Sequence, residues 1–224
     1  MRPKSAVTAT TRSIPEQSHD VNIPERYGAQ VAAGNETESA MALATEQWLH
    51  PDARVLRPED GTTPGKALLV RDVAEPLRTR MSVTLRRVAS PFHWSLYEDA
   101  RIKVEAGFGV TAEEAVRRVQ QMREGTERTG VDLYLARDER RLVGAVGRFR
   151  LPVPDRPWAR LQEVDVFPDW RGLGYGDALL SAVIGLLHDE GCGAVVVGAD
   201  EDDWPVHWYR RRGFRDAGRV ALTR

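Results

Sequence analysis

Cysteine is almost absent from this sequence of 224 residues, which contains only Cys192. A single cysteine excludes an intrachain disulfide framework and a zinc site built from several cysteines. The five histidines form no H-E-x-x-H pair, so zinc-dependent hydrolysis is not indicated and we expect no metal site. Scarce cysteine is typical of a reducing compartment, and we therefore expect a cytoplasmic protein.

Long apolar runs and a charge imbalance are also missing. Apolar stretches such as residues 178–187 are interrupted and too short for the roughly 30 Å hydrocarbon layer, so we expect no membrane partner. The 32 Lys and Arg residues nearly balance the 33 Asp and Glu residues, which excludes a general basic footprint for nucleic acid. The basic start lacks the apolar stretch of a secretory signal, although its Arg, Ser and Thr content is weakly similar to that of an organellar transit peptide.

The chain divides near residue 80. Residues 1–80 are expected to form an N-terminal extension that is mostly irregular and largely disordered, because residues 1–43 are polar and show no helical or strand period. Only residues 42–49 and 66–70 are candidates for a turn of helix and a short strand. We hypothesise that Met81 is a usable start and that the residues before it are dispensable.

Residues 81–224 carry the patterns of an α/β domain, with a mixed central sheet flanked by helices. Ser90 followed by Pro91, and Thr111 with Glu114, are helix-start signals, and Gly130 is a stop signal. Helices are predicted at residues 91–104, 112–127, 174–190 and 205–212, and strands at residues 81–88, 131–136, 142–151, 159–167 and 194–198, with one closing strand after residue 214.

A glycine-bearing turn lies where the strand at residues 159–167 leads into the helix at residues 174–190. Glycines let the backbone approach an anion closely, and the free N–H groups at a helix start attract phosphate. The turn reads Arg171, Gly172, Leu173, Gly174, Tyr175, Gly176. A dinucleotide fingerprint would need glycine at Asp177, and a Walker loop would need Gly-Lys-Ser/Thr, so the spacing excludes both.

This segment resembles motif A of the GNAT superfamily of acyl-CoA-dependent N-acyltransferases, whose pattern is R/Q-x-x-G-x-G/A. Arg171, Gly174 and Gly176 fill the required positions. Downstream, residues 208–214 resemble motif B of the same family, in which a tyrosine is followed by Gly-Phe. The resemblance covers residues 159–214 by motif and residues 81–158 by element order.

The resemblance implies an acyl-CoA cleft between two parallel strands that splay apart, with acetyl-CoA as the cosubstrate. The backbone amides of residues 171–176, from Arg171 through Gly172, Leu173, Gly174 and Tyr175 to Gly176, would bind the diphosphate. The backbone of Val166 would pair with the pantetheine arm, and Asp202 falls where many relatives carry an asparagine near it.

Two catalytic roles follow from the resemblance and from the chemistry of amines. Tyr209 sits where the family's tyrosine protonates the departing thiolate; the alternative is a core tyrosine under the Gly-Phe turn. An ammonium acceptor must lose a proton, and Glu163, Asp165 or a water relay is the candidate base; a solvated or ion-paired carboxylate is the alternative. In a regular strand Gln162 and Val164 face the opposite side, and a bulge would change the assignment.

Several other residues near these motifs have two possible interpretations. The acidic run at residues 200–203 either caps the next helix or attracts a cationic acceptor, and His207 is either a proton shuttle or a surface residue. Trp94, Tyr97 and Trp158 either line an acceptor pocket or pack in the core.

Two features depart from the family pattern. The charge of Asp177 either weakens diphosphate binding or caps the helix, and the chain ends ten residues after Phe214, with room for one closing strand instead of two. The acceptor side would then be open or completed by a partner chain, as in a homodimer.

The sequence therefore predicts an N-acetyltransferase that moves an acetyl group directly from acetyl-CoA to a primary amine of a small molecule or peptide. The alternatives are a protein or peptide N-terminal acyltransferase and a non-catalytic acyl-CoA-binding domain.

Overall fold

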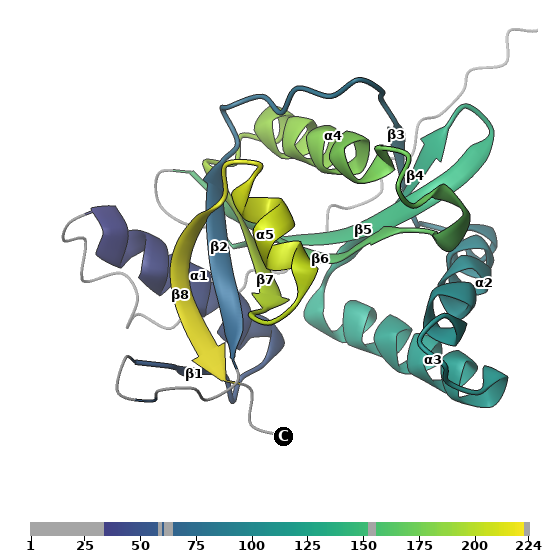
Figure 1. Ribbon diagram of the computed structural model, residues 1–224, viewed down its shortest axis with the longest axis horizontal. Coiled ribbons are helices and arrows are strands. Elements are labelled where there is room, and N and C mark those ends of the chain that lie inside the picture. The colour runs from purple at the N-terminus through teal and green to yellow at the C-terminus, as the bar shows by residue number, and fades with distance from the viewer. Residues whose placement is uncertain (1–33, 58–59, 61–64, 152–155, 222–224) are drawn as a thin grey trace, which may run out of the picture.

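The computed structural model describes residues 34–57, 60, 65–151 and 156–221. Its strands form one eight-stranded mixed sheet with helices on both faces, which confirms the expected fold class (Figure 1). The helices are α1 (Gly34–Leu49), α2 (Pro91–Ala106), α3 (Ala112–Thr129), α4 (Tyr175–Asp189) and α5 (Trp204–Arg210), with a 3-10 helix, η3 (Pro168–Trp170). The strands are β1 (Arg54–Val55), β2 (Lys66–Asp72), β3 (Thr84–Arg87), β4 (Asp132–Asp138), β5 (Arg141–Leu151), β6 (Trp158–Val166), β7 (Ala194–Asp200) and β8 (Arg215–Ala221).

The strands lie in the order β1-β8-β2-β7-β6-β5-β4-β3. Strands β6 and β7 are parallel, and every other neighbouring pair in the described sheet is antiparallel. From β3 to β8 the elements follow the order predicted from the sequence, so local patterns were sufficient for this part of the chain.

The segment before residue 81 supplies a strand to the interior of the sheet. Strand β2 lies between β7 and β8, with Leu69 opposite both Val197 and Asp216. The candidate pieces at residues 42–49 and 66–70 fall within α1 and β2, and residues 1–33 lie outside the described residues. Within the expected irregular extension, α1, β1 and β2 are therefore regular, and a boundary at residue 81 would remove a strand from within the sheet.

This insertion also corrects the expectation that a single closing strand completes the sheet. Lys66 to Val70 pair with residues of β8, and Lys66 to Asp72 pair with all seven residues of β7. The chain thus provides its own second closing strand. A sequence pattern could not show this, because the pairing joins residues more than a hundred positions apart.

The predicted helix boundaries are explained by local caps. The Ser90 hydroxyl accepts a hydrogen bond from the His93 N–H at 3.3 Å, and the Thr111 hydroxyl accepts one from the Glu114 N–H at 3.2 Å. Gly130 ends α3 in the left-handed conformation with φ of 67°. Each cap satisfies backbone groups that the helix itself leaves unpaired.

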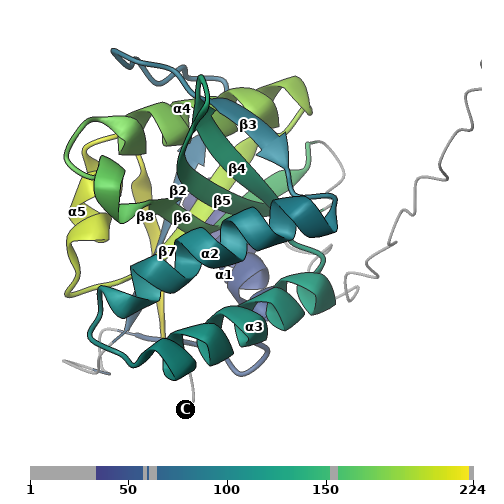
Figure 2. The same ribbon diagram turned by 90° about the vertical axis from the view of Figure 1, so that its right-hand side faces the viewer.

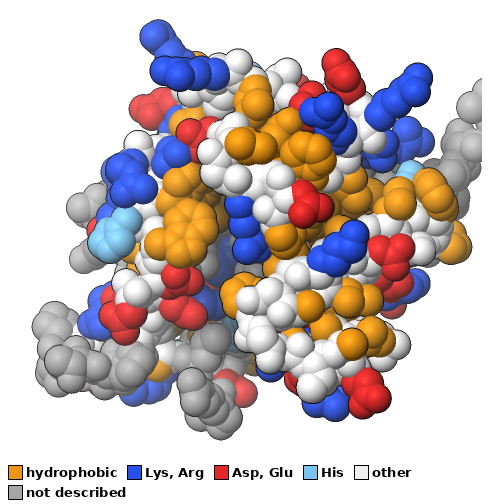
Figure 3. Space-filling view, turned by 45° about the vertical axis from the view of Figure 1, so that its right-hand side comes forward, with side chains coloured by type: hydrophobic (Ala, Val, Ile, Leu, Met, Phe, Trp, Pro, Cys, Tyr) orange, Lys and Arg blue, Asp and Glu red, His pale blue; other side chains and the backbone are white. Residues whose placement is uncertain are grey.

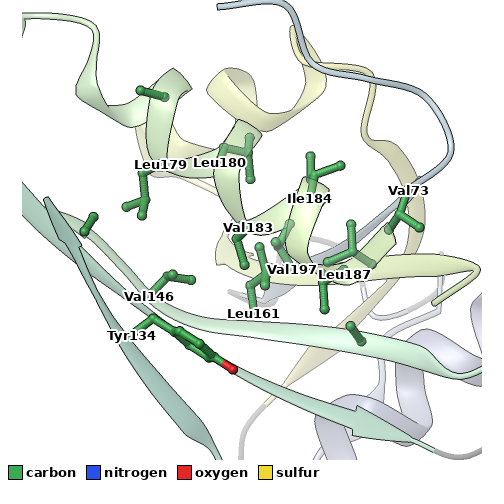
Figure 4. Packing of buried hydrophobic residues seen from close by; sticks show 14 of the residues in the cluster. Val73, Tyr134, Val146, Leu161, Leu179, Leu180, Val183, Ile184, Leu187 and Val197 are labelled. Carbon is green, nitrogen blue, oxygen red and sulfur yellow. The ribbon is translucent and has the colours of Figure 1, made fainter. Parts of the chain in front are cut away.

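Alternation along β7 divides the core between the two faces of the sheet. Val195 and Val197 pack beneath α4, whereas Val196 packs against Ala42 of α1. Helices α2 and α3 lie on the same face as α1 (Figure 2). Figure 4 shows the α4 side, where Leu179, Leu180, Val183, Ile184 and Leu187 meet Val146, Leu161 and Val197. This packing fixes the start of α4 beside the end of β6.

Among the described residues, no helix has the length and apolar character needed to cross a bilayer. The same residues contain no group of His, Cys, Asp and Glu side chains suited to hold a metal ion.

Candidate active site

The two parallel strands separate soon after they begin. Strands β6 and β7 pair through three residues, from Trp158 opposite Ala194 to Arg160 opposite Val196. Beyond this point β6 continues along β5 and β7 continues along β2. This side of the molecule is hollowed, and Lys or Arg side chains lie in the hollow (Figure 3). The structure thus contains the divergence of parallel strands that the resemblance implies.

The glycine-bearing turn lies at the end of β6 and carries two left-handed residues. Gly172 has φ of 74° and Gly174 has φ of 91°, and both values are strained for residues with a side chain. Gly174 is the N-cap of α4, and its position makes no side-chain cap hydrogen bond. The first N–H groups of α4 are therefore free of a side-chain cap and suited to an anion.

Asp177 ties the first turn of α4 to α5. Its carboxylate accepts hydrogen bonds from the Trp208 indole N–H at 3.2 Å and from Arg212 Nε at 2.5 Å. The Trp208 ring also approaches the backbone of Gly176, where an added Cβ would lie 3.3 Å from it. The charge of Asp177 is thus balanced by the charge of Arg212.

Arg171, the first residue of motif A, turns back toward the strand. Its Nε donates a hydrogen bond to the Val166 carbonyl at 3.0 Å. The arginine therefore holds the turn against the end of β6, at the residue whose backbone we expect to meet pantetheine.

A β-bulge in β6 decides which carboxylates share a face. Ala145 of β5 lies opposite Asp165, whereas Gly147 lies opposite Gln162, so two residues of β6 face one residue of β5. Glu163 is the bulged residue, with φ of 48°. Val164 packs toward the α4 core, while Glu163 and Asp165 both reach Arg101 of α2.

Arg101 is shared by three carboxylates. Its Nη2 lies 2.7 Å from Glu105 and 3.5 Å from Glu163, and its Nη1 contacts Asp165. The Glu163 side chain is 30% exposed and that of Asp165 is 19% exposed. Of the two candidate bases, Glu163 is the more accessible to an acceptor or to water, although both are ion-paired.

Tyr209 is buried in the core, near the C-terminal end of α5. Its ring packs edge-on against Trp208 and Phe214, at centroid distances of 4.7 and 5.2 Å. Burial raises the pKa of the Tyr209 phenol, and the positive charge of Arg160 acts in the opposite direction. Motif B therefore brings its tyrosine against Phe214 of the Gly-Phe turn, as the alternative interpretation expected.

The remaining candidates have structural partners. Tyr97 is buried and its hydroxyl donates to Met122 Sδ at 3.0 Å, and Trp158 packs beside α1, so both contribute to cores. Asp203 caps α5 by accepting from the Trp204 N–H at 2.7 Å. Glu201 is paired with Arg219, at 2.6 Å from Nη2.

Asp202 is exposed in the turn before α5, and His207 is exposed on that helix. Trp94 of α2 is partly buried against the cluster that contains Tyr97, and the Arg123 guanidinium lies over its ring. The Asp203 carboxylate thus caps α5 and Glu201 is ion-paired with Arg219, whereas Asp202 is exposed to solvent.

The sequence analysis missed two arginines at this site. Arg101 organises the carboxylates of the bulge, and Arg160 forms a buried ion pair with Glu46 of α1. For Arg160, the available signal was an arginine at an inward position of a predicted strand, because a buried charge requires a partner.

The sequence matches the acetyltransferase (GNAT) family over residues 94–214. No curated protein sequence matches the chain.

Among solved structures, a functionally unknown conserved protein from Staphylococcus epidermidis is 16% identical, with a TM-score of 0.55 over 83% of this chain and 76% of that one. A GNAT-family acetyltransferase from Colwellia psychrerythraea is 12% identical, with a TM-score of 0.50 over 70% of this chain and 55% of that one. A GCN5-related N-acetyltransferase from Sphaerobacter thermophilus is 21% identical, with a TM-score of 0.44 over 81% of this chain and 54% of that one. The chain thus spans little more than half of the last two proteins, and the likeness concerns the fold.

Proposed function

The chain belongs to the GNAT acetyltransferase family, and we propose that it transfers the acetyl group of acetyl-CoA to a primary amine of a small molecule or peptide. One observation carries the proposal. The left-handed turn at Gly172 and Gly174 opens α4 beside the point where β6 and β7 diverge. An anion site and an adjoining slot between strands fit the diphosphate and the extended arm of one ligand.

The donor would be held mainly by backbone groups. The amides from Arg171 to Gly176 would bind the diphosphate, with Gly172, Leu173, Gly174 and Tyr175 between them, and the glycine φ values support this close approach. Val166 would pair with pantetheine through its backbone, and Asp202 would lie near the same arm.

The acceptor would enter from the face that carries the bulge. It arrives as an ammonium ion, and Glu163 would take its proton directly or through water, with Asp165 as the neighbouring alternative. The free amine then attacks the thioester carbonyl, and Tyr209 would give its proton to the departing thiolate. Cys192 is buried in the core, which is consistent with direct transfer and no acylated cysteine. We also expect a cytoplasmic location; a homodimer stays a prediction that the sheet does not require.

Thiol release from acetyl-CoA and longer acyl-CoAs should be measured against amines, aminoglycosides, polyamines and peptides. We expect amine-dependent release that is fastest with acetyl-CoA. Release with peptides alone would support the peptide N-terminal alternative. If calorimetry shows CoA binding but no amine causes thiol release, a non-catalytic domain is supported. If CoA does not bind at all, the acetyltransferase proposal and both alternatives are contradicted.

A further inference from the structure

Two tryptophans of α5 form a chain of contacts that begins at the glycine-bearing turn. The Trp208 ring packs against Gly176, where an added Cβ would lie 3.3 Å from it, and its indole N–H donates to Asp177 at 3.2 Å. Trp204 lies one turn earlier on α5 and meets Trp208 nearly edge-on, with ring centroids 6.2 Å apart and an interplanar angle of 67°. The Trp204 indole is therefore separated from the start of α4 by a single side chain.

The Trp204 indole is left in solvent at this place. Trp204 is 67% exposed, and Leu173 within the turn is 59% exposed. The other large apolar residues that are exposed in the described part of the chain belong to α1, β1, α3, and α2 with the turn after it. Leaving an indole in water forgoes the free energy of burying it, and tryptophan is enriched where proteins bind ligands and partners. Trp204 and Leu173 thus give the rim of the candidate donor site an exposed apolar surface.

The two other tryptophans beside the turn are covered by arginines. The Arg212 guanidinium lies 4.5 Å from the ring centroid of Trp208, and the Arg141 guanidinium lies 5.6 Å from that of Trp170. Both rings are also partly buried against the core that contains α4. Among the described residues, Trp204 is therefore the tryptophan of this region whose ring is available to a ligand.

The chemistry of CoA explains why an aromatic ring would be useful here. In CoA the pantetheine arm leaves one end of the diphosphate, and the adenosine is joined to the other end through its ribose. A diphosphate bound at the turn therefore places the adenine one ribose away from it. Purine rings stack on tryptophan, and such stacking contributes substantially to nucleotide affinity. An exposed indole beside an anion-binding turn supplies both contacts that a nucleotide needs.

We propose that the Trp204 indole is the platform on which the adenine of CoA stacks when the diphosphate lies on the turn. The inference rests on the proposed function and adds a contact for the part of the donor that does not react. The pantetheine arm separates the adenine from the thioester, so Trp204 acts on donor binding and not on the chemical step. Trp204 thus selects acyl-CoA over the same acyl group carried by phosphopantetheine alone.

Calorimetry on the full chain tests this role with two ligands, CoA and phosphopantetheine, the second of which lacks the adenosine. Trp204→Leu should weaken CoA binding about tenfold and leave phosphopantetheine binding unchanged. Trp204→Phe should keep most of the CoA affinity, because a smaller aromatic ring still stacks. Equal CoA affinity in Trp204→Leu and the parent would overturn the inference. Equal weakening of both ligands would also overturn it, since Trp204 would then only support Trp208 and the turn.

Phe108→Leu is a matched control, because Phe108 is 66% exposed and follows α2 instead of bordering the turn. This variant removes an equally exposed aromatic ring and should bind CoA with parental affinity. Weakening of CoA binding in Phe108→Leu to the same extent as in Trp204→Leu would contradict a specific role for Trp204.

Fluorescence and kinetics provide two further measurements. The emission of etheno-CoA, in which the adenine carries a fluorescent modification, should be quenched by the parent and much less by Trp204→Leu. With acetyl-CoA, Trp204→Leu should raise the KM about tenfold with kcat near the parental value, since the lost contact is the same in the ground state and the transition state. Absence of CoA binding to the parent would refute the proposed function. Parental binding and quenching by Trp204→Leu would refute the role of Trp204 alone.

Discussion

Leu69 of β2 is fully buried and lies directly opposite Val197 of β7. This pair joins a segment before the motif-bearing region to the strand that borders the candidate CoA slot. Strand β7 pairs with β6 over three residues only, whereas all seven of its residues pair with β2. The N-terminal segment therefore supports one wall of the candidate active site.

A fragment beginning at Met81 should fail to fold. It would lose Glu46 and would expose β7 and β8 along the positions of Leu68, Leu69 and Val70, three side chains whose burial contributes roughly 5 kcal/mol or more. Circular dichroism and thermal unfolding would check this, with a fragment beginning at Gly34 as the control. Cooperative unfolding of the shorter fragment near the parent temperature would support the hypothesis that residues 1–80 are dispensable.

Gly174→Val should weaken CoA binding at least tenfold. Valine is strained at φ of 91° and would deform the turn whose amides are proposed to bind diphosphate. Gly130→Val is a matched control, because it imposes similar strain at φ of 67° at the end of α3, away from the turn. Calorimetry should show a loss for the first variant and near-parental affinity for the second; equal affinities would count against the diphosphate site.

Tyr209→Phe should lower kcat by about a hundredfold with little effect on KM for acetyl-CoA. The ring would keep its contacts with Trp208 and Phe214, so stability should change little. Tyr134→Phe provides a control, since it removes the hydroxyl of another buried tyrosine, bonded to Arg148 at 3.1 Å. Parental kcat in the Tyr209 variant would leave that residue as a core tyrosine only.

Glu163→Gln should reduce kcat/KM more than Asp165→Asn does. Both changes remove a carboxylate from Arg101, but the Glu163 side chain is the more exposed of the two and better placed to take a proton. We expect about a tenfold to hundredfold loss for the first variant at neutral pH. The reverse order would identify Asp165 as the base, and small effects of both would favour a water relay to another group.

Glu46 should make stability sensitive to acid. Its pKa in the folded state is lowered from the ordinary value of 4.5 after the charges of Arg160 and Lys66 outweigh burial. A lowered folded pKa gives stability that is fully present above the unfolded value and is lost as the pH falls through the folded value. Urea unfolding below pH 4.5 should therefore show a weaker pH dependence in Glu46→Gln than in the parent. Glu38→Gln, which alters an exposed pair with Arg215, should retain the parental dependence.

Local sequence signals predicted much of the structure from residue 81 onward. Caps at Ser90 and Thr111, the stop at Gly130 and the glycine turn before α4 all depend on short-range hydrogen bonds or backbone strain. These features are readable from residue type and spacing alone. The order of strands and helices was predictable for the same reason, because each element has its own local pattern.

Features that depend on distant residues were not predictable in this way. The bulge at Glu163 was left open because the residue is not a glycine, and its ion-pair partner Arg101 lies on a helix distant in the sequence. The ion pair of Glu46 with Arg160 spans 114 positions. The placement of β2 depends on strands near the other end of the chain, so its short apolar pattern indicated a strand without indicating its neighbours.

The position of β2 also has a consequence for synthesis on the ribosome. Its two neighbours, β7 and β8, are translated last, so the apolar Leu68, Leu69 and Val70 emerge long before either can cover them. A nascent chain carries this unpaired segment through most of translation, which makes it a binding site for chaperones and a risk for aggregation until residue 221 has left the exit tunnel.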